Sequence, residues 1–143
     1  MKKNNQNNSE LQLFNNFVIF KTENGKVNID VFFKNDTLWL TQKKMSELFE
    51  INVSAISKHL KNIFEIGELD EKVVVSILEH TTQHGAIVGK TQNKFVKYYN
   101  LKAITAVGYR VNSHRAMEFR KWATEILHEY IIYIVYRICQ SII

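Results

Sequence analysis

The chain has 143 residues, a length at which one domain is expected rather than a TIM barrel or a multi-domain enzyme. A hydrophobic fraction of 45% and a charged fraction of 23% exclude a wholly disordered or fibrous protein. The net charge of +5 is compatible with an anionic partner. Because the single cysteine excludes an intramolecular disulfide and no apolar signal segment follows the start, we expect a cytoplasmic protein.

The first forty residues predict a polar tail and then antiparallel strands. The Asn-rich opening lacks periodicity, and we expect a disordered tail over residues 1–16. Runs rich in Val, Ile and Phe follow, separated by the turn signals Asn24-Gly25 and Asn35-Asp36. Residues 28–33 alternate polar and apolar side chains until the end of the run, as a half-buried strand does. Two or three antiparallel strands are therefore predicted over residues 17–40.

From Thr41 the apolar residues take helical spacing. Thr41 can cap a first helix, the chain turns at residues 50–52, and a second helix follows. The apolar faces of the two helices are Met45, Leu48 and Phe49, then Ile56, Leu60 and Ile63. This spacing predicts a helix-turn-helix over residues 41–64.

In a helix-turn-helix the second helix enters the major groove, with its outward side chains near the N-terminus at base edges. Here the serines and Val53 can contact bases, and the lysines of the second helix can neutralise phosphates. Polar residues at the start of the first helix lie beside the DNA backbone in this geometry. The candidate DNA-binding residues of this unit are Gln42, Lys43, Val53, Ser54, Ser57, Lys58 and Lys61.

A simpler interpretation stays open. Two short amphipathic helices joined by a turn are common in any helical core, and lysines on their outer faces are usually only solvated. The chain also has Ser46 and Glu50 where a helix-turn-helix usually has a small Ala or Gly and a turn glycine. Glu50 must therefore adopt a left-handed conformation, or the turn is longer than usual.

The second half predicts a hairpin and two helices. Residues 73–78 and 94–99 are β-rich runs joined by a long polar tip. Asn100 can cap a helix from Leu101 to residues 112–113, and a final helix starts near His114.

The final helix has a predicted inner stripe and a basic edge. We expect Phe119 and Trp122 to be core residues, on a stripe with Ala123, Ile126, Leu127 and Tyr130. Arg110, Arg115, Arg120 and Lys121 can line a basic edge where the two helices meet, and the arginines are expected to add contacts to the DNA backbone.

The predicted fold class is α+β: N-terminal antiparallel strands, a helix-turn-helix, a second β-hairpin and a C-terminal helical pair. If the first strands and the second hairpin form one sheet, a winged helix-turn-helix is the alternative.

Three segments resemble the bacterial virulence-protein RhuM family: Leu38 to Glu71, Tyr98 to Ser113 and Phe119 to Ile131. The last two also resemble, more weakly, the phage antirepressor domain Bro-N. The resemblance implies one RhuM-like domain over residues 17–132 that binds duplex DNA. It further implies a transcriptional regulator of mobile-element or pathogenicity-island type, without enzymatic activity. Because relatives usually continue with another domain, a truncated or frame-shifted product is a further expectation.

A different function remains as an alternative, a protein-interaction or antirepressor module that acts on another regulator without contacting DNA. No phosphate-binding glycine loop, HExxH or GxSxG motif occurs, so we expect no enzyme and no cofactor. His80 and His84 lack enough further ligands for a metal site, and Cys139 has no identifiable His partner.

Residues 133–143 form an apolar C-terminal tail. The run YIIYIVY has seven apolar or aromatic residues, whereas a membrane-spanning helix needs about twenty, so no membrane is expected. We expect a helix covered by the core or by a second copy of the chain, and hence a homodimer or larger assembly through residues 130–143.

Overall fold

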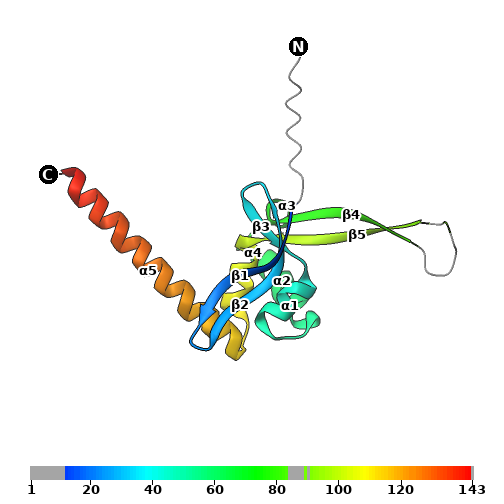
Figure 1. Ribbon diagram of the computed structural model, residues 1–143, viewed down its shortest axis with the longest axis horizontal. Coiled ribbons are helices and arrows are strands. Elements are labelled where there is room, and N and C mark those ends of the chain that lie inside the picture. The colour runs from blue at the N-terminus through cyan, green and yellow to red at the C-terminus, as the bar shows by residue number, and fades with distance from the viewer. Residues whose placement is uncertain (1–11, 84–88, 90, 143) are drawn as a thin grey trace, which may run out of the picture.

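Five strands form one antiparallel sheet that shares a core with the helices (Figure 1). The computed structural model describes residues 12–83, 89 and 91–142. The sheet has the order β1-β2-β3-β5-β4. In chain order the elements are β1 (Gln12–Thr22), β2 (Gly25–Lys34), β3 (Thr37–Leu40), α1 (Gln42–Phe49), α2 (Val53–Glu65), α3 (Glu71–Val74), β4 (Val75–Gln83), β5 (Thr91–Asn100), α4 (Leu101–Arg110) and α5 (His114–Ile142). The predicted α+β class is confirmed.

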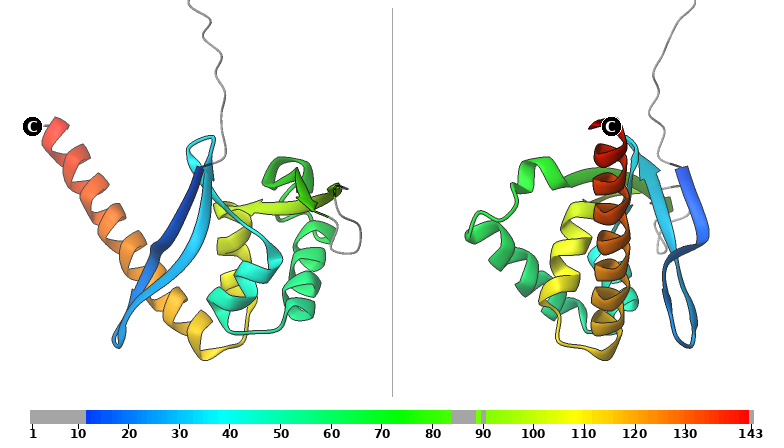
Figure 2. Two further views of the ribbon diagram at one scale, coloured as in Figure 1. Left: turned by 45° about the vertical axis from the view of Figure 1, so that its right-hand side comes forward. Right: turned by 90° about the vertical axis from the view of Figure 1, so that its left-hand side faces the viewer.

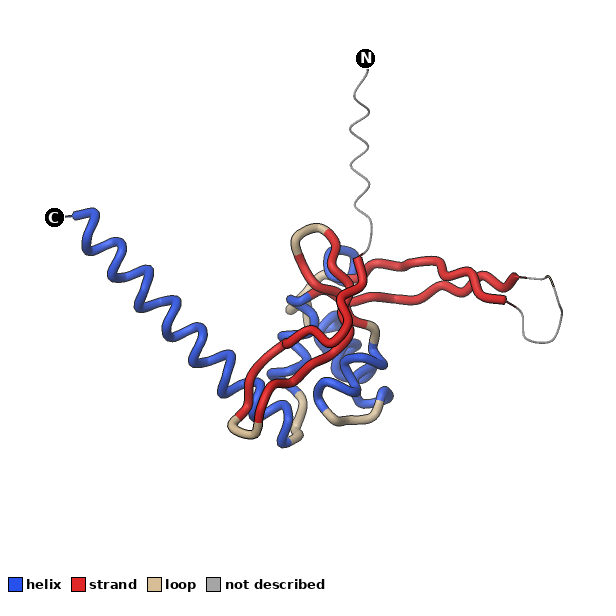
Figure 3. Tube along the Cα trace, viewed as in Figure 1, coloured by secondary structure: helices blue, strands red, loops and turns tan. Residues whose placement is uncertain are grey.

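The short strand β3 joins the N-terminal strands to the second hairpin. Leu38 is in register with Phe33 of β2, and Leu40 is in register with Tyr99 of β5. The first strands and the β4–β5 hairpin are therefore one sheet, which is the condition for a winged arrangement. The hairpin extends away from the helices, as the red strands of Figure 3 show.

The predicted tail is too long, because β1 already begins at Gln12. Residues 12–14 pair with residues 31–33 of β2, and the register shifts between Phe14 and Phe17. The Asn15-Asn16 pair that looks like the end of a tail lies at this irregularity of the strand. A β-bulge lets a strand continue past residues that interrupt the alternation. Residues 1–11 lie outside the described part of the chain.

The β-rich run over residues 73–78 begins as a helix. Asp70 caps the single turn α3, where its carboxylate accepts from Lys72 N at 3.0 Å. The strand β4 starts only at Val75. A good N-cap three residues before the run outweighs the β preference of its first valines. The two turn signals are confirmed, since Gly25, Asn35 and Asp36 all have positive φ angles.

The core lies where α1, α2, α4 and the start of α5 meet the sheet. Phe119 is buried, as predicted, with its ring centroid 5.4 Å from those of Phe20 and Phe49. The sheet also carries a pair of aromatic rings outside this cluster, Phe32 and Tyr98, with centroids 5.2 Å apart. Burial raises the pKa of the Tyr98 phenol, because the charged phenolate loses solvation.

The helix α5 is continuous from His114 to Ile142, so the residues expected as a separate tail extend this helix. The predicted inner stripe holds only as far as Ala123, because Ile126, Leu127 and Tyr130 are exposed. The outer half of the helix points away from the rest of the protein in the left view of Figure 2. Within the described residues the core therefore does not cover this half of the helix. Of the two expected covers, the core and a second copy of the chain, the first is wrong.

Candidate nucleic-acid interface

Both helices of the α1–α2 unit begin with an N-cap side chain, and the cap at Thr41 was predicted from the sequence. The Thr41 side chain accepts from Lys44 N at 3.2 Å at the start of α1. The Asn52 side chain accepts from Ala55 N at 2.8 Å at the start of α2. Each cap satisfies a backbone donor that has no partner within its own helix. These caps place the turn at residues 50–52 and fix where α2 begins.

The turn between α1 and α2 has the left-handed geometry that a glycine usually provides. Glu50 has φ 53° and ψ 45°, which confirms that it takes the αL conformation. The Ser46 hydroxyl donates to the carbonyl of Ile51, and Ile51 N donates back to Ser46 O at 3.2 Å. Ser46 is therefore small enough to fit at this turn, and its hydroxyl also holds the turn closed by a hydrogen bond.

The outward face of α2 carries the side chains that the sequence predicts to contact bases and phosphates. Val53 is 42% exposed, and Ser54, Ser57 and Lys58 are exposed beside it. The Ser54 hydroxyl donates to Asn52 Oδ1 at 2.9 Å. Ile56, Leu60 and Ile63 lie on the opposite side of α2 and are buried, as predicted, and so are Met45, Leu48 and Phe49 of α1. The buried face therefore fixes the rotation of α2, so that its polar face points outward.

The lysines of this surface differ in whether their side chains already have an ion-pair partner. Lys43 and Lys58 are exposed and form no ion pair with another residue in the described part of the chain. Lys61 is 77% exposed and lies 3.9 Å from Glu65, one turn further along α2. An exposed pair of this kind contributes little to stability, so Lys61 can exchange it for a phosphate.

Gln42 has a structural contact, unlike the lysine next to it. Its side-chain amide donates to the Tyr99 hydroxyl at 2.9 Å, which ties the start of α1 to β5. The contact is partly buried, so this side chain is less available to DNA than Lys43.

Two of the predicted arginines bind other parts of the protein. Arg110 donates to Asn62 Oδ1 at 2.9 Å and to Glu68 Oε2 at 2.6 Å, which attaches α4 to α2 and the segment that follows it. Arg120 donates through Nη1 to the carbonyls of Gly108 and Val111 at 3.0 and 2.8 Å, at the end of α4.

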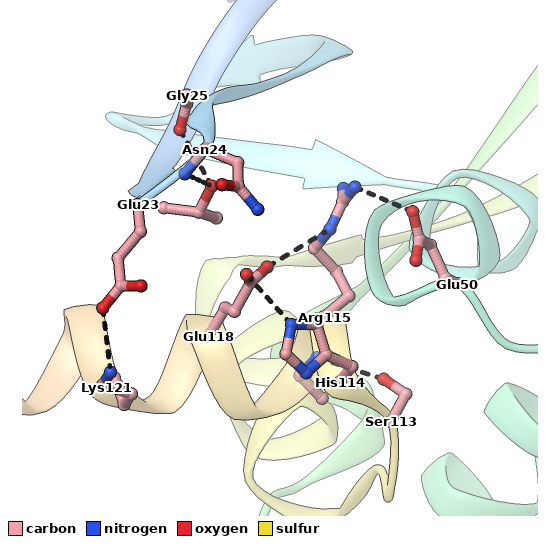
Figure 4. A network of polar contacts seen from close by, with 11 residues as sticks. Glu23, Asn24, Gly25, Glu50, Ser113, His114, Arg115, Glu118 and Lys121 are labelled. Carbon is pink, nitrogen blue, oxygen red and sulfur yellow. Dashed lines mark hydrogen bonds and ion pairs between the residues drawn. The ribbon is translucent and has the colours of Figure 1, made fainter.

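Arg115 is engaged in the same way. It lies at the start of α5 and contacts two carboxylates, Glu50 and Glu118, in the network of Figure 4. His114 also reaches Glu118, at 3.3 Å, so the carboxylate lies between two basic side chains. The three arginines thus brace the junctions of α4 and α5, and the candidate interface reduces to α2 with Lys43.

The β4–β5 hairpin adds a residue that the sequence did not single out. The end of α2 and the hairpin line one depression, to which Phe64, Val75, Ile77 and Lys97 contribute. Lys94 is exposed further out on the same hairpin. The pairing of β3 with β5 places the base of the hairpin, with Lys97, beside the end of α2, and no local motif signals that pairing. Lys97 itself lies 3.6 Å from Glu71 of α3.

The combination of this sheet with the α1–α2 unit and a helical pair defines an α+β protein with an exposed polar helix face. The model of the virulence protein RhuM family matches residues 73–136, from α3 to the outer half of α5. This match supports the resemblance to the RhuM family over these residues, which are fewer than half of the chain. The α1–α2 unit precedes the matched residues. No curated protein and no solved structure matches the chain.

None of the helices in the described ranges has the length and apolar character needed to cross a membrane. Within the same ranges, no group of three or more His, Cys, Asp or Glu residues is placed to hold a metal ion. His84, one of the two histidines considered for a metal pair, lies outside the described residues.

Proposed function

We propose that this protein binds duplex DNA by inserting the outward face of α2 into the major groove, and that it acts in the cytoplasm as a transcriptional regulator. The observation that carries the proposal is the division of α2 into two faces. Ile56, Leu60 and Ile63 are buried, while Val53, Ser54, Ser57 and Lys58 are exposed over its first two turns. A capped helix with one buried and one exposed face, preceded by another helix and a tight turn, has the geometry of the second helix in a helix-turn-helix.

The sheet supports a winged form of this unit. The strand before α1 pairs with β5, and β5 pairs with β4, so the hairpin lies beside the end of α2. A hairpin in that place can follow the DNA backbone next to the groove that α2 occupies. Lys94 supplies the positive charge for such a contact.

The decisive experiment is fluorescence anisotropy of labelled mixed-sequence duplexes with the full chain at two salt concentrations. Binding should weaken steeply with salt, because each phosphate contact releases condensed counterions. The double variant Lys58→Glu, Lys61→Glu should lose binding at both concentrations.

A matched control is the double variant Lys26→Glu, Lys102→Glu, which changes the net charge equally at exposed sites on β2 and α4. It should keep most of the affinity if α2 is the reading helix. Equal losses in the two variants would show that only total charge matters, and no binding by the parent chain at low salt would overturn the proposal.

A second candidate function is a protein-interaction or antirepressor module that acts without DNA contact. It is favoured by the exposed apolar half of α5, a surface suited to a protein rather than to DNA. A regulator captured equally by the parent chain and by the Lys58→Glu, Lys61→Glu variant, together with no DNA binding by the parent, would establish this function instead.

A further inference from the structure

The outer half of α5, residues 124–142, is exposed along its whole length. The inner half packs on the core through Ala116 and Phe119, with Trp122 and Ala123 partly buried. Figure 1 shows the helix leaving the body beyond that contact. The large apolar residues exposed on the outer half are Ile126, Leu127, Tyr130, Ile131, Ile132, Tyr133, Ile134, Val135, Tyr136, Ile138 and Ile142.

A helix with these properties needs a cover. Residues 124–142 span about 28 Å at the helical rise of 1.5 Å per residue. A helix that is apolar on most sides is normally buried, and most helical stability in proteins comes from the packing of an apolar face. Nothing in the described part of the chain packs on this half.

The apolar residues are not equivalent around the helix. At about 100° per residue, five aliphatic side chains fall on one side and form what we call the aliphatic stripe. Successive side chains of the stripe are four, three, four and four residues apart. The stripe consists of Leu127, Ile131, Ile134, Ile138 and Ile142.

The opposite side of the same segment carries its polar groups. Arg137 lies over the Tyr133 ring at 5.9 Å, and Gln140 donates to the Tyr136 hydroxyl at 2.7 Å. These side chains satisfy one another within the helix and can face water. The aliphatic stripe has no such polar groups, so it is the side that requires a partner.

We propose that the aliphatic stripe pairs with the same stripe of a second copy of this chain. Leu and Ile residues spaced by three and four are the pattern with which identical helices pack their side chains into one another's gaps. The stripe carries no charge, so a second copy meets it without repulsion. The stripe is about 22 Å long at 1.5 Å per residue, and two helices in contact over that length bury on the order of 1,000 Å², the area that a specific interface should reach.

The geometry of α5 leaves room for this partner. The stripe is turned by about a quarter turn from the side through which Ala116 and Phe119 pack on the core, given about 100° per residue. A second helix can therefore lie on the stripe without displacing the sheet. The pairing does not depend on the proposed DNA binding, and it adds a consequence: the dimer presents two copies of α2, as a reader of paired half-sites requires.

The test is the mass of the full chain in solution, measured without DNA by light scattering coupled to gel filtration. The parent chain of 16.8 kDa should have the mass of a dimer. The variant Ile131→Glu, Ile138→Glu should be monomeric, because it places two charges on the stripe. The matched variant Tyr133→Glu, Tyr136→Glu adds the same charge to the opposite side and should stay dimeric.

Two further measurements keep the result decisive. Far-UV circular dichroism should show that the glutamate variants remain folded, and the milder variant Ile131→Ala, Ile138→Ala should raise the dimer dissociation constant by at least tenfold. A monomeric parent chain would overturn the proposal. Equal dissociation of both glutamate variants would also overturn it, as would a parent chain that is monomeric in buffer but sediments with phosphatidylcholine vesicles.

Discussion

Arg115 donates through Nη2 to Glu50 Oε1 at 2.7 Å, and this contact attaches the turn between α1 and α2 to the start of α5. Glu50 is also the residue of that turn with a left-handed backbone. The proposed DNA-reading helix and the proposed dimer helix are therefore joined through one side-chain pair. Any change in the direction of α5 can reach α2 by this contact.

Substitution of Glu50 separates the contribution of the ion pair from that of the backbone. Glu50→Gly loses an exposed pair worth at most about 1 kcal/mol but relieves a left-handed conformation that costs a non-glycine residue roughly as much. We expect its free energy of unfolding to stay within about 1 kcal/mol of the parent. Glu50→Val loses the same pair and increases the strain, because a β-branched residue tolerates a positive φ less well than Glu, so it should destabilise by about 1 to 3 kcal/mol. Urea unfolding of the two variants checks this, and equal effects would contradict it.

Gly108 is required by the close approach of α4 and α5. A Cβ atom at this position would lie 2.5 Å from Phe119 Cε1 and 3.0 Å from Phe49 Cζ. Gly108→Ala gains about 1 kcal/mol of helix propensity but overpacks the core at a cost of roughly 1 to 3 kcal/mol. We expect a net loss, measured by thermal or urea unfolding. The second change Phe119→Leu should cost less in the Gly108→Ala background than in the parent, and additive effects would show that the two side chains do not compete.

The local structure of this protein was predictable because its signals are local. Thr41 and Asn100 cap the helices that follow them, and the alternation from Asn28 marks β2. The buried sides of α1 and α2 follow from the spacing of Met45 and Leu60 with their neighbours. Each of these features depends on residues only a few positions apart.

The features that the sequence did not signal at all have long-range causes. The pairing of β3 with β5 joins residues about sixty positions apart, and neither run signals its partner. Arginines look alike in a sequence whether they contact phosphate or protein. Arg110 finds its partners Asn62 and Glu68 only after α4 packs against α2. The sequence therefore predicted which face of α2 is exposed but not that the three arginines contact other parts of the protein, and the DNA contacts themselves stay a prediction.

The N-cap of α2 gives a test of how the helix start is held. Asn52→Ala removes the acceptor for Ala55 N and should lower the free energy of unfolding by about 1 kcal/mol. Asn52→Asp keeps the acceptor and should stay close to the parent value, because Asp caps helices about as well as Asn. Thermal unfolding of the two variants measures the difference. A loss of equal size in both would mean that the amide group, rather than the cap oxygen, matters here.

The roles assigned to Lys58 and Arg120 make opposite predictions for stability and salt dependence. Arg120 Nη1 donates to the carbonyls of Gly108 and Val111, so Arg120→Ala should lower the free energy of unfolding by about 1.5 to 3 kcal/mol. Its salt dependence of DNA binding should match the parent, because the guanidinium contacts protein and not phosphate.

Lys58→Ala should do the reverse. The side chain is exposed, so the free energy of unfolding should change by less than about 0.5 kcal/mol. The slope of log Kobs against log salt concentration should become shallower by about 0.9, the value for one lost phosphate contact on B-form DNA. Titrations at four salt concentrations give both slopes. A shallower slope for Arg120→Ala with unchanged stability would show that Arg120 contacts phosphate, because removal of a residue that contacts only protein leaves the number of released counterions unchanged.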